Sequence, residues 1–288
     1  MNKILERIIP GAVYKKGFII NGKTYPFYSF SQPNSENSWS DYLTEQLEIP
    51  SKNHFIDIYN RKIVFDSIKG KLVQGASYLD AGCSSGYMLE NILDKFSEIN
   101  IIGTDFFSSG LLQCHQRFPD IPLFQMDLVS CSFPDNLFDV VSCLNVIEHI
   151  PADASVIKQL FRITKPGGIV VLTVPTMPGL YDMHDEVYSH VRRYKLSELE
   201  RMMERAGFKI VKANYFGVFM YPVFYAIKKI NRMRFSKLSF AEKRQRVFNA
   251  IKKTGRCCFL EYACFIEQAI GWKINYPYGF RGYIVASK

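Results

Sequence analysis

Two acidic residues, Asp80 and Asp105, carry the strongest chemical signal in the chain. Asp80 ends a short apolar run and precedes the glycine-containing loop 82–86, and Asp105 ends the next apolar run. Glycine lets a backbone approach a ligand closely, and an acid at the end of a second strand can bind both hydroxyls of a ribose. The pair therefore predicts a βαβ unit with a nucleoside-containing ligand at its carboxyl edge.

The residues of this loop distinguish between two kinds of ligand. A dinucleotide requires G-x-G-x-x-G, so that backbone N–H groups and a helix N-terminus can face a pyrophosphate. Here Ser84 follows Gly82 where the second glycine is needed, and Tyr87 takes the place of the last glycine. Asp80 would also repel a pyrophosphate. S-adenosylmethionine (SAM) has no phosphate and carries an ammonium group, so the loop favours SAM.

Four segments in order resemble the motifs of class I SAM-dependent methyltransferases. Residues 80–86 resemble motif I (D-x-G-x-G-x-G), with Ser84 in place of the middle glycine. Residues 121–128 resemble the third strand, whose acid and neighbours hold the adenine. Residues 138–150 resemble the fourth strand and its loop, and residues 165–175 the turn and fifth strand. The resemblance is to bacterial enzymes of small-molecule, glycan or lipid pathways.

The resemblance implies where SAM is bound. The loops after the first four strands would supply the contacts, which are Asp80, Ala81, Gly82, Cys83, Gly86, Asp105, Phe106, Met126, Asp127, Leu128 and Asn145. We interpret Cys83 as a small loop residue. The seven cysteines show no CxxC or Cys/His spacing of a metal site, so we predict no metal.

Candidate catalytic residues lie after the fourth and fifth strands. Methyl transfer is an in-line displacement, and a hydroxyl nucleophile gains from a general base. His190 is the first candidate, because segment 181–194 resembles the Asp…His-x-Arg-Arg-Tyr segment of many bacterial methyltransferases. Asp185 shares this loop, and His149 follows Glu148 after the fourth strand. For each of them, the alternative is that it only organises its loop by hydrogen bonds.

Hydrophobic patterns predict the elements that position these residues. We expect an α/β fold with a Rossmann-like, seven-stranded, mostly parallel sheet, an antiparallel last strand and helices on both faces. A helix is expected from about His54 to Ile68, and a hairpin over residues 18–25 around Asn21-Gly22. The strands are expected at 77–81, 100–105, 121–127, 138–144, 168–174, 209–214 and 282–287.

The chain divides into three predicted parts. Residues 1–70 form an N-terminal extension with a cap helix. Residues 71–217 and 276–288 form the SAM-binding core. Residues 218–275 form a helical insertion before the last strand. The insertion holds twelve Lys and Arg against three acids, an excess that equals the net charge of +9 for the whole chain.

Periodicity predicts how the insertion packs. Val223, Ile227 and Ile230 share one helical face, with Lys228 opposite, so we expect the apolar face to pack inward and the basic face to lie outside. Residues 257–270 are apolar nearly all round and are expected to form a core helix.

Three roles remain open for the insertion. It could contact an anionic membrane surface, with Phe224, Tyr225, Phe235 and Phe248 entering the interface. It could bind nucleic acid, or it could be a solvated lid over a soluble acceptor. Nucleic acid is the weakest reading, since residues 145–148 lack the Asn/Asp-Pro-Pro-aromatic loop of enzymes that methylate base amines.

The function that these patterns predict is SAM-dependent methylation of a hydroxyl on a small or lipid- or glycan-linked molecule. An RNA methyltransferase and a non-catalytic SAM-binding regulator or scaffold are the alternatives. No apolar run reaches the length of a transmembrane helix, and Glu6 and Arg7 interrupt the first apolar stretch. We therefore expect a cytoplasmic protein, peripheral to the membrane if the insertion contacts lipid.

Overall fold

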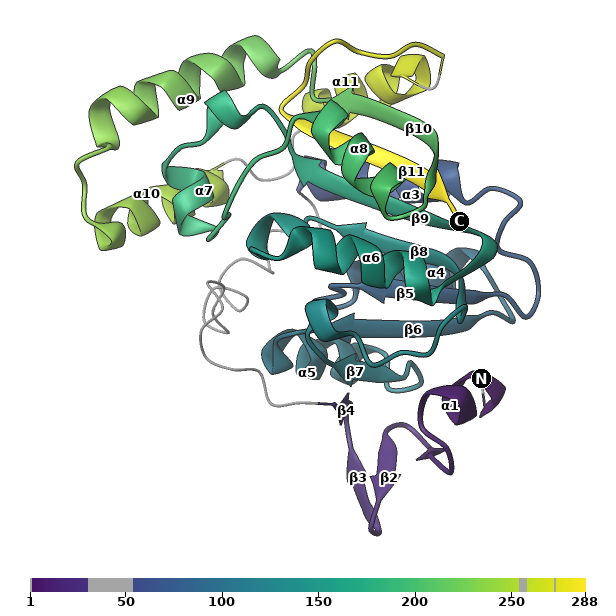
Figure 1. Cartoon of the computed structure of the whole chain (residues 1–288). Coiled ribbons are helices and arrows are strands. Elements are labelled where there is room, and N and C mark those ends of the chain that lie inside the picture. Colours follow the sequence, from purple (N-terminus) through teal and green to yellow (C-terminus); the bar gives the residue numbers. More distant parts are fainter. Residues whose placement is uncertain (1, 31–53, 254–257, 272) are drawn as a thin grey trace.

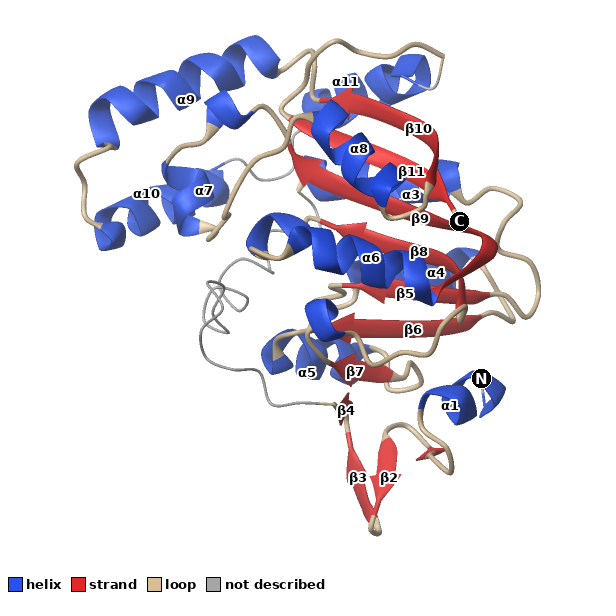
Figure 2. Cartoon of the chain, viewed as in Figure 1, coloured by secondary structure: helices blue, strands red, loops and turns tan. Residues whose placement is uncertain are grey.

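The computed structural model describes residues 2–30, 54–253, 258–271 and 273–288. Its centre is an eight-stranded sheet with the order β10-β11-β9-β8-β5-β6-β7-β4 (Figures 1 and 2). The strands are β4 (Tyr28–Ser29), β5 (Ser77–Ala81), β6 (Asn100–Asp105), β7 (Leu123–Gln125), β8 (Phe138–Leu144), β9 (Thr164–Pro175), β10 (Lys209–Phe216) and β11 (Arg281–Ser287).

Strand direction confirms the predicted fold class. The strands from β4 to β9 pair in parallel, while β11 pairs antiparallel with both β9 and β10. The sheet has one strand more than predicted, because Tyr28 and Ser29 pair with Phe124 and Gln125 of β7. The added strand covers an edge that would otherwise expose unpaired backbone groups.

Helices cover both faces of the sheet (Figure 2). On one face α3 (Phe55–Ser67), α4 (Tyr87–Lys95) and α5 (Ser108–Arg117) bury their apolar sides in one hydrophobic cluster. On the other face α6 (Asp153–Ile163) and α8 (Leu196–Arg205) contribute to a second cluster. The two packed layers hold the carboxyl ends of β5 to β9 at one edge.

The N-terminal extension packs on this core. Helix α1 (Asn2–Ile8) buries Leu5, and the predicted hairpin forms from β2 (Phe18–Ile20) and β3 (Lys23–Tyr25) beside β1 (Val13–Tyr14). Asn21 and Gly22 at its turn have φ of 50° and 75°, as a type I′ turn requires. Part of the predicted extension, residues 31–53, lies outside the described residues.

The insertion contains three helices, α9 (Tyr221–Phe235), α10 (Phe240–Lys253) and α11 (Cys258–Gly271). The predicted orientation of α9 was wrong: Val223, Ile227 and Ile230 are exposed, and Lys228 is buried. Lys228 turns inward because two buried carboxylates of α7 (Met183–Val187) and its N-cap lie beneath it. None of the described helices is long and apolar enough to cross a membrane.

Helix α11 also departs from its predicted place in the core. It contacts α3 and β10, yet Tyr262, Phe265 and Ile270 on it are exposed. Its anchor is polar: the buried Glu267 carboxylate accepts hydrogen bonds from the backbone N–H groups of Gly217 and Phe219. The helix therefore packs through one face only.

Candidate functional site

A cavity of about 870 Å³ lies at the carboxyl edge of the parallel strands. Its walls come from the loops after β5, β6, β7 and β8, from the start of α3, from α7, and from α9 and α10 of the insertion. Ligands of open α/β sheets bind at this edge because the loops diverge there. One end is lined by the predicted cofactor loops, and the other by His190 and charged side chains.

The loop after β5 requires glycine at position 82. Gly82 has a φ of +85°, and a Cβ there would lie 2.3 Å from Cγ2 of Val146. The next residue of the cavity wall, Ser84, adopts a φ of 46°. Ser84 can replace the middle glycine of the motif because it takes up the left-handed conformation despite its side chain. Glycine is needed at position 82 because the Val146 side chain occupies the space that a Cβ would take.

Asp105 lies at the end of β6 and fixes this loop. Its two carboxylate oxygens accept hydrogen bonds from the backbone N–H groups of Ser84 (2.9 Å) and Phe107 (3.0 Å). Each carboxylate oxygen has further lone pairs, so the group can also accept two ribose hydroxyls from the cavity. Asp127 is held in the same way, since it accepts a hydrogen bond from the Val129 N–H at 2.8 Å.

Apolar side chains complete the cofactor end. Phe106, Met126 and Leu128 line the cavity next to Asp105 and Asp127, which suits a flat adenine with polar edges. Asn145 lines it from the loop after β8 at a φ of 56°. The predicted cofactor residues that line the cavity are Gly82, Asp105, Phe106, Met126, Asp127, Leu128 and Asn145.

Four predicted cofactor residues lie beneath the cavity instead of lining it. Asp80 is buried and accepts a 2.6 Å hydrogen bond from Ser142, and burial raises its pKa to about 7. Ala81 is fully buried within β5. Burial raises the pKa of the Cys83 thiol, which therefore stays protonated. Gly86 is required by packing, because a Cβ there would lie 2.5 Å from Sγ of Cys114. Their contact with SAM stays a prediction.

At the other end His190 and Asp185 form a hydrogen-bonded pair in the cavity wall. Nδ1 of His190 lies 2.8 Å from a carboxylate oxygen of Asp185. Burial lowers the pKa of His190 to about 4, although Asp185 opposes the shift. Burial acts to raise the pKa of Asp185, but the His190 hydrogen bond and the charges of Arg193 and Lys228 outweigh it and keep that pKa far below its usual range.

A network of charges fixes this pair. Arg193 donates to the same Asp185 oxygen at 2.8 Å, and Lys228 of α9 donates to the other at 3.1 Å. Lys228 also contacts Asp182, the N-cap of α7, which accepts a hydrogen bond from Asn231 at 2.7 Å. The insertion is thereby tied to the candidate base through buried ion pairs.

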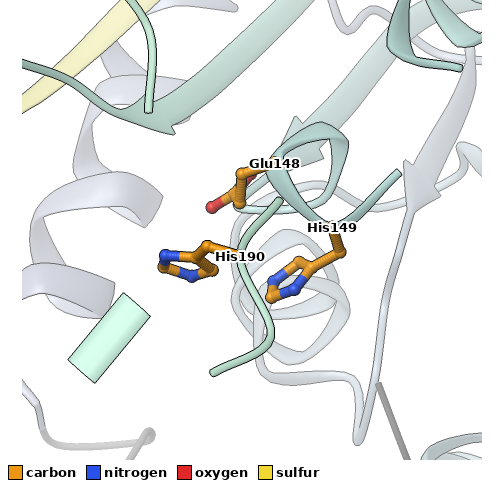
Figure 3. Close-up of side chains that lie close together, drawn as sticks. All are labelled: Glu148, His149 and His190. Atoms are coloured by element: carbon orange, nitrogen blue, oxygen red, sulfur yellow. The ribbon is translucent and has the colours of Figure 1, made fainter. Parts of the chain in front are cut away.

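Glu148, His149 and His190 come together at this end (Figure 3). The rings of His149 and His190 lie edge to face, with their centroids 4.9 Å apart. One potential ligand atom from each of the three residues lies within 4.8 Å of the others, so the group could hold a metal ion. The Arg281 guanidinium lies 3.8 Å from the Glu148 carboxylate, and its charge disfavours a second cation there. The absence of a metal stays a prediction.

Sequence reasoning missed several residues of this end. Arg281 comes from the last strand and donates to Asn145 at 2.6 Å, so it links the two ends of the cavity. Lys228 was predicted to lie on the surface, but it lines the cavity. His54 and Asp57 also line the cavity and were not predicted there. The feature that could have identified Arg281 is its position at the start of the last strand. Because β11 is antiparallel, it begins at the carboxyl edge of the sheet, beside Pro175 of β9.

Comparisons with known proteins agree with this geometry. A family model described as a methyltransferase domain matches residues 53–213, more than half of the chain. A probable SAM-dependent methyltransferase of Mycolicibacterium smegmatis is 29% identical over 138 residues, which are 47% of this chain and 53% of that protein. A ubiquinone biosynthesis O-methyltransferase of Pseudomonas fluorescens is 30% identical over 111 residues, covering 37% of this chain and 48% of that protein.

Solved structures share the fold. Phosphoethanolamine N-methyltransferase 2 of Haemonchus contortus, in complex with SAM, superposes with a TM-score of 0.58 and 16% identity over 88% of this chain and 58% of that one. The chain spans about half the length of the curated relatives it matches. The family match and the motif geometry lead to one conclusion: the chain belongs to the methyltransferase domain family of class I SAM-dependent methyltransferases.

Proposed function

We propose that the protein transfers the methyl group of SAM to a hydroxyl oxygen of a small or lipid-linked acceptor, with His190 as the general base. One observation carries this proposal: a neutral histidine, oriented by a buried carboxylate, lines the cavity next to the predicted cofactor end. A hydroxyl is a weak nucleophile until its proton is removed, and a histidine in this setting can accept that proton.

The protonation state of His190 follows from its partner. Asp185 is ionised, so its oxygens only accept hydrogen bonds, and Nδ1 of His190 must be the donor. Because the ring is neutral near pH 7, its Nε2 then carries the lone pair. Asp185 also stabilises the imidazolium that forms once the acceptor's proton has moved to Nε2.

The cofactor end fits SAM in two respects. Asp105 can accept hydrogen bonds from ribose hydroxyls, and Phe106, Met126 and Leu128 offer an apolar slot for adenine. When bound, SAM supplies an electrophilic methyl group on a sulfonium. The protein's contribution is then to orient the acceptor, exclude water and remove the acceptor's proton.

Charges of both signs line the cavity and do not by themselves select the acceptor atom. The cations Arg193, Lys228, Arg246 and Arg281 are accompanied by the aspartates Asp57, Asp105, Asp127 and Asp185. Arg193 and Lys228 are already paired with Asp185. The preference for oxygen therefore rests on the candidate base.

Paired acceptors test this proposal. The protein would be incubated with SAM and a panel of phenols, with and without an alkyl chain, each matched by the aniline of the same shape. S-adenosylhomocysteine (SAH) release and the mass of the methylated product are measured. The proposal expects methylated oxygen with at least one phenol, and faster turnover than with its aniline. Turnover of the anilines alone would contradict it.

A further inference from the structure

The outer face of α9 is apolar and has no partner in the described part of the chain. Val223, Ile227 and Ile230 are exposed by 61%, 45% and 46%, and Met233 by 76%. Spacings of three and four residues place these four side chains in one stripe along the helix. A helix that faces water normally buries such a stripe and exposes its lysines, whereas α9 exposes the stripe and buries Lys228.

Buried contacts hold α9 in this orientation. Lys228 pairs with Asp182 and Asp185, and Asn231 donates to Asp182. Phe224 stacks on Phe280 with ring centroids 4.3 Å apart. Rotating the helix to hide its apolar stripe would break the buried ion pairs of Lys228 with Asp182 and Asp185, which is unfavourable. These buried contacts therefore keep the apolar stripe of α9 on the outside of the molecule.

Cations surround the stripe. Lys229, Arg232, Arg234 and Lys237 are all exposed on or just after α9. An exposed apolar stripe beside lysine and arginine is the pattern of a helix that lies in a lipid interface, where anionic headgroups meet the cations. A second copy of the chain is a poorer partner, because a two-fold contact would bring like charges together.

The cavity lies against the same helix. Ile227, Lys228 and Asn231 line it from α9, and Arg246 and Asn249 line it from α10. α9 lies at the outer edge of the molecule, away from the sheet (Figure 1). Any surface on which α9 rests is thus one helix diameter from the acceptor end, about 10 Å.

We propose that α9 docks on an anionic phospholipid surface, with Val223, Ile230 and Met233 in the interface, and that the acceptor is a membrane-resident molecule. The docking stands on the surface of α9, and the acceptor class rests on the proposed function. Of the four aromatic residues expected to enter the interface, Phe224 packs inward against Phe280, and Tyr225 is exposed.

Vesicle flotation tests the docking without turnover. The full chain, with SAH present, is floated with vesicles of phosphatidylcholine alone or mixed with phosphatidylglycerol, at low and physiological salt. The test variant is Val223→Ser/Ile230→Ser/Met233→Ser, which leaves the cavity residue Ile227 unchanged. The matched control is Val73→Ser/Val211→Ser, at residues exposed by 62% and 61% outside the insertion.

The proposal expects binding to phosphatidylglycerol vesicles at least about tenfold tighter than to phosphatidylcholine. It also expects the triple variant to bind about tenfold more weakly and the control to bind like the wild type. No flotation of the wild type, or equal flotation of the triple variant, would overturn it. A dimer in sedimentation velocity that the triple variant dissociates would also overturn it.

Flotation, acceptor turnover and SAH affinity are measured in the same samples, so that this proposal and the proposed function can be judged separately. If the protein floats with vesicles but methylates none of the acceptors, the docking proposal stands and the proposed reaction is contradicted. If it methylates water-soluble phenols but does not float, the proposed reaction stands and the docking proposal is contradicted.

Discussion

The two ends of the cavity are built in different ways. The cofactor end is assembled from consecutive strand–loop units between β5 and β8, and its contacts are backbone groups, two carboxylates and apolar side chains. The acceptor end is assembled from α3, α7, α9, α10 and β11, and it is held by a buried network of ion pairs. The comparison shows that the shared ligand is encoded locally, whereas the acceptor end depends on distant segments.

Among the variants, His190→Gln should show the largest difference between an effect on turnover and an effect on SAH affinity. Without a base the reaction should slow by roughly a hundredfold to ten-thousandfold in kcat, while SAH affinity stays the same because His190 lies outside the cofactor loops. Turnover of an identified acceptor and calorimetric titration with SAH measure the two effects. His184→Gln, in α7 and also in the cavity wall, is the control and should keep most of the turnover. Equal losses in both variants would argue against a base.

The pH dependence of the wild type sharpens the same point. His190 must be neutral to act, and its pKa is lowered to about 4, so turnover should rise with pH through about 4 and then stay level to about pH 7. Initial rates in overlapping buffers, with folding checked by circular dichroism, give this profile. A rise centred on pH 6 to 7 would point to another group.

At the cofactor end, Gly82→Ala should weaken SAH binding by about a hundredfold or more, which is roughly 2.7 kcal/mol. The added Cβ would both collide with Val146 and force a φ of +85° on alanine. Gly70→Ala is the control for backbone strain, since Gly70 has a φ of +74° with nothing within 4 Å of a Cβ. If both variants bind SAH equally well, the close approach at Gly82 is not what the ligand needs.

Asp105→Asn should weaken SAH binding by about tenfold to a hundredfold. Hydrogen bonds to a charged acceptor contribute about 1.5–3 kcal/mol, and the amide keeps only one accepting oxygen. Asp94→Asn, at an exposed position of α4, is the control. Titration with adenosine should show the same loss, because the contact is to the ribose. Unchanged affinity would remove Asp105 from the cofactor contacts.

The smallest expected effect concerns Glu148, which lies with His149 and His190. Burial raises the pKa of Glu148 from 4.5 to about 7, so the folded protein keeps a proton that the unfolded chain releases. This contribution to stability is present below pH 4.5 and is lost as pH rises to about 7. Glu148→Gln should therefore gain stability relative to the wild type between pH 5 and 8, on the order of 1–3 kcal/mol. Chemical denaturation at pH 5 and at pH 8 measures the free energy of unfolding of the wild type and of Glu148→Gln, with Glu204→Gln as the control.

The difference between the two ends also explains what the sequence could predict. The strands and cofactor loops follow from local patterns. Gly82, Asp105 and Asp127, which line the cavity, were predicted because each lies at or just after the end of its own strand. The orientation of α9 could not be found this way, because the partners of Lys228 lie in α7, some forty residues earlier in the chain. Arg281 was missed for the same reason, since only the antiparallel pairing of β11 brings it to Asn145.

Position 80 shows a limit of another kind. An acid after an apolar run predicted contact with the ammonium group of SAM, and this contact stays a prediction. The period of a strand does not show that the Asp80 side chain would be buried and bonded to Ser142.

The most direct test of the account is a crystal structure of the protein with SAH. The account predicts adenine beside Phe106, Met126 and Leu128, ribose hydroxyls bonded to Asp105, and the sulfur facing the end that holds His190. SAH bound elsewhere, or with its sulfur turned away from His190, would contradict it.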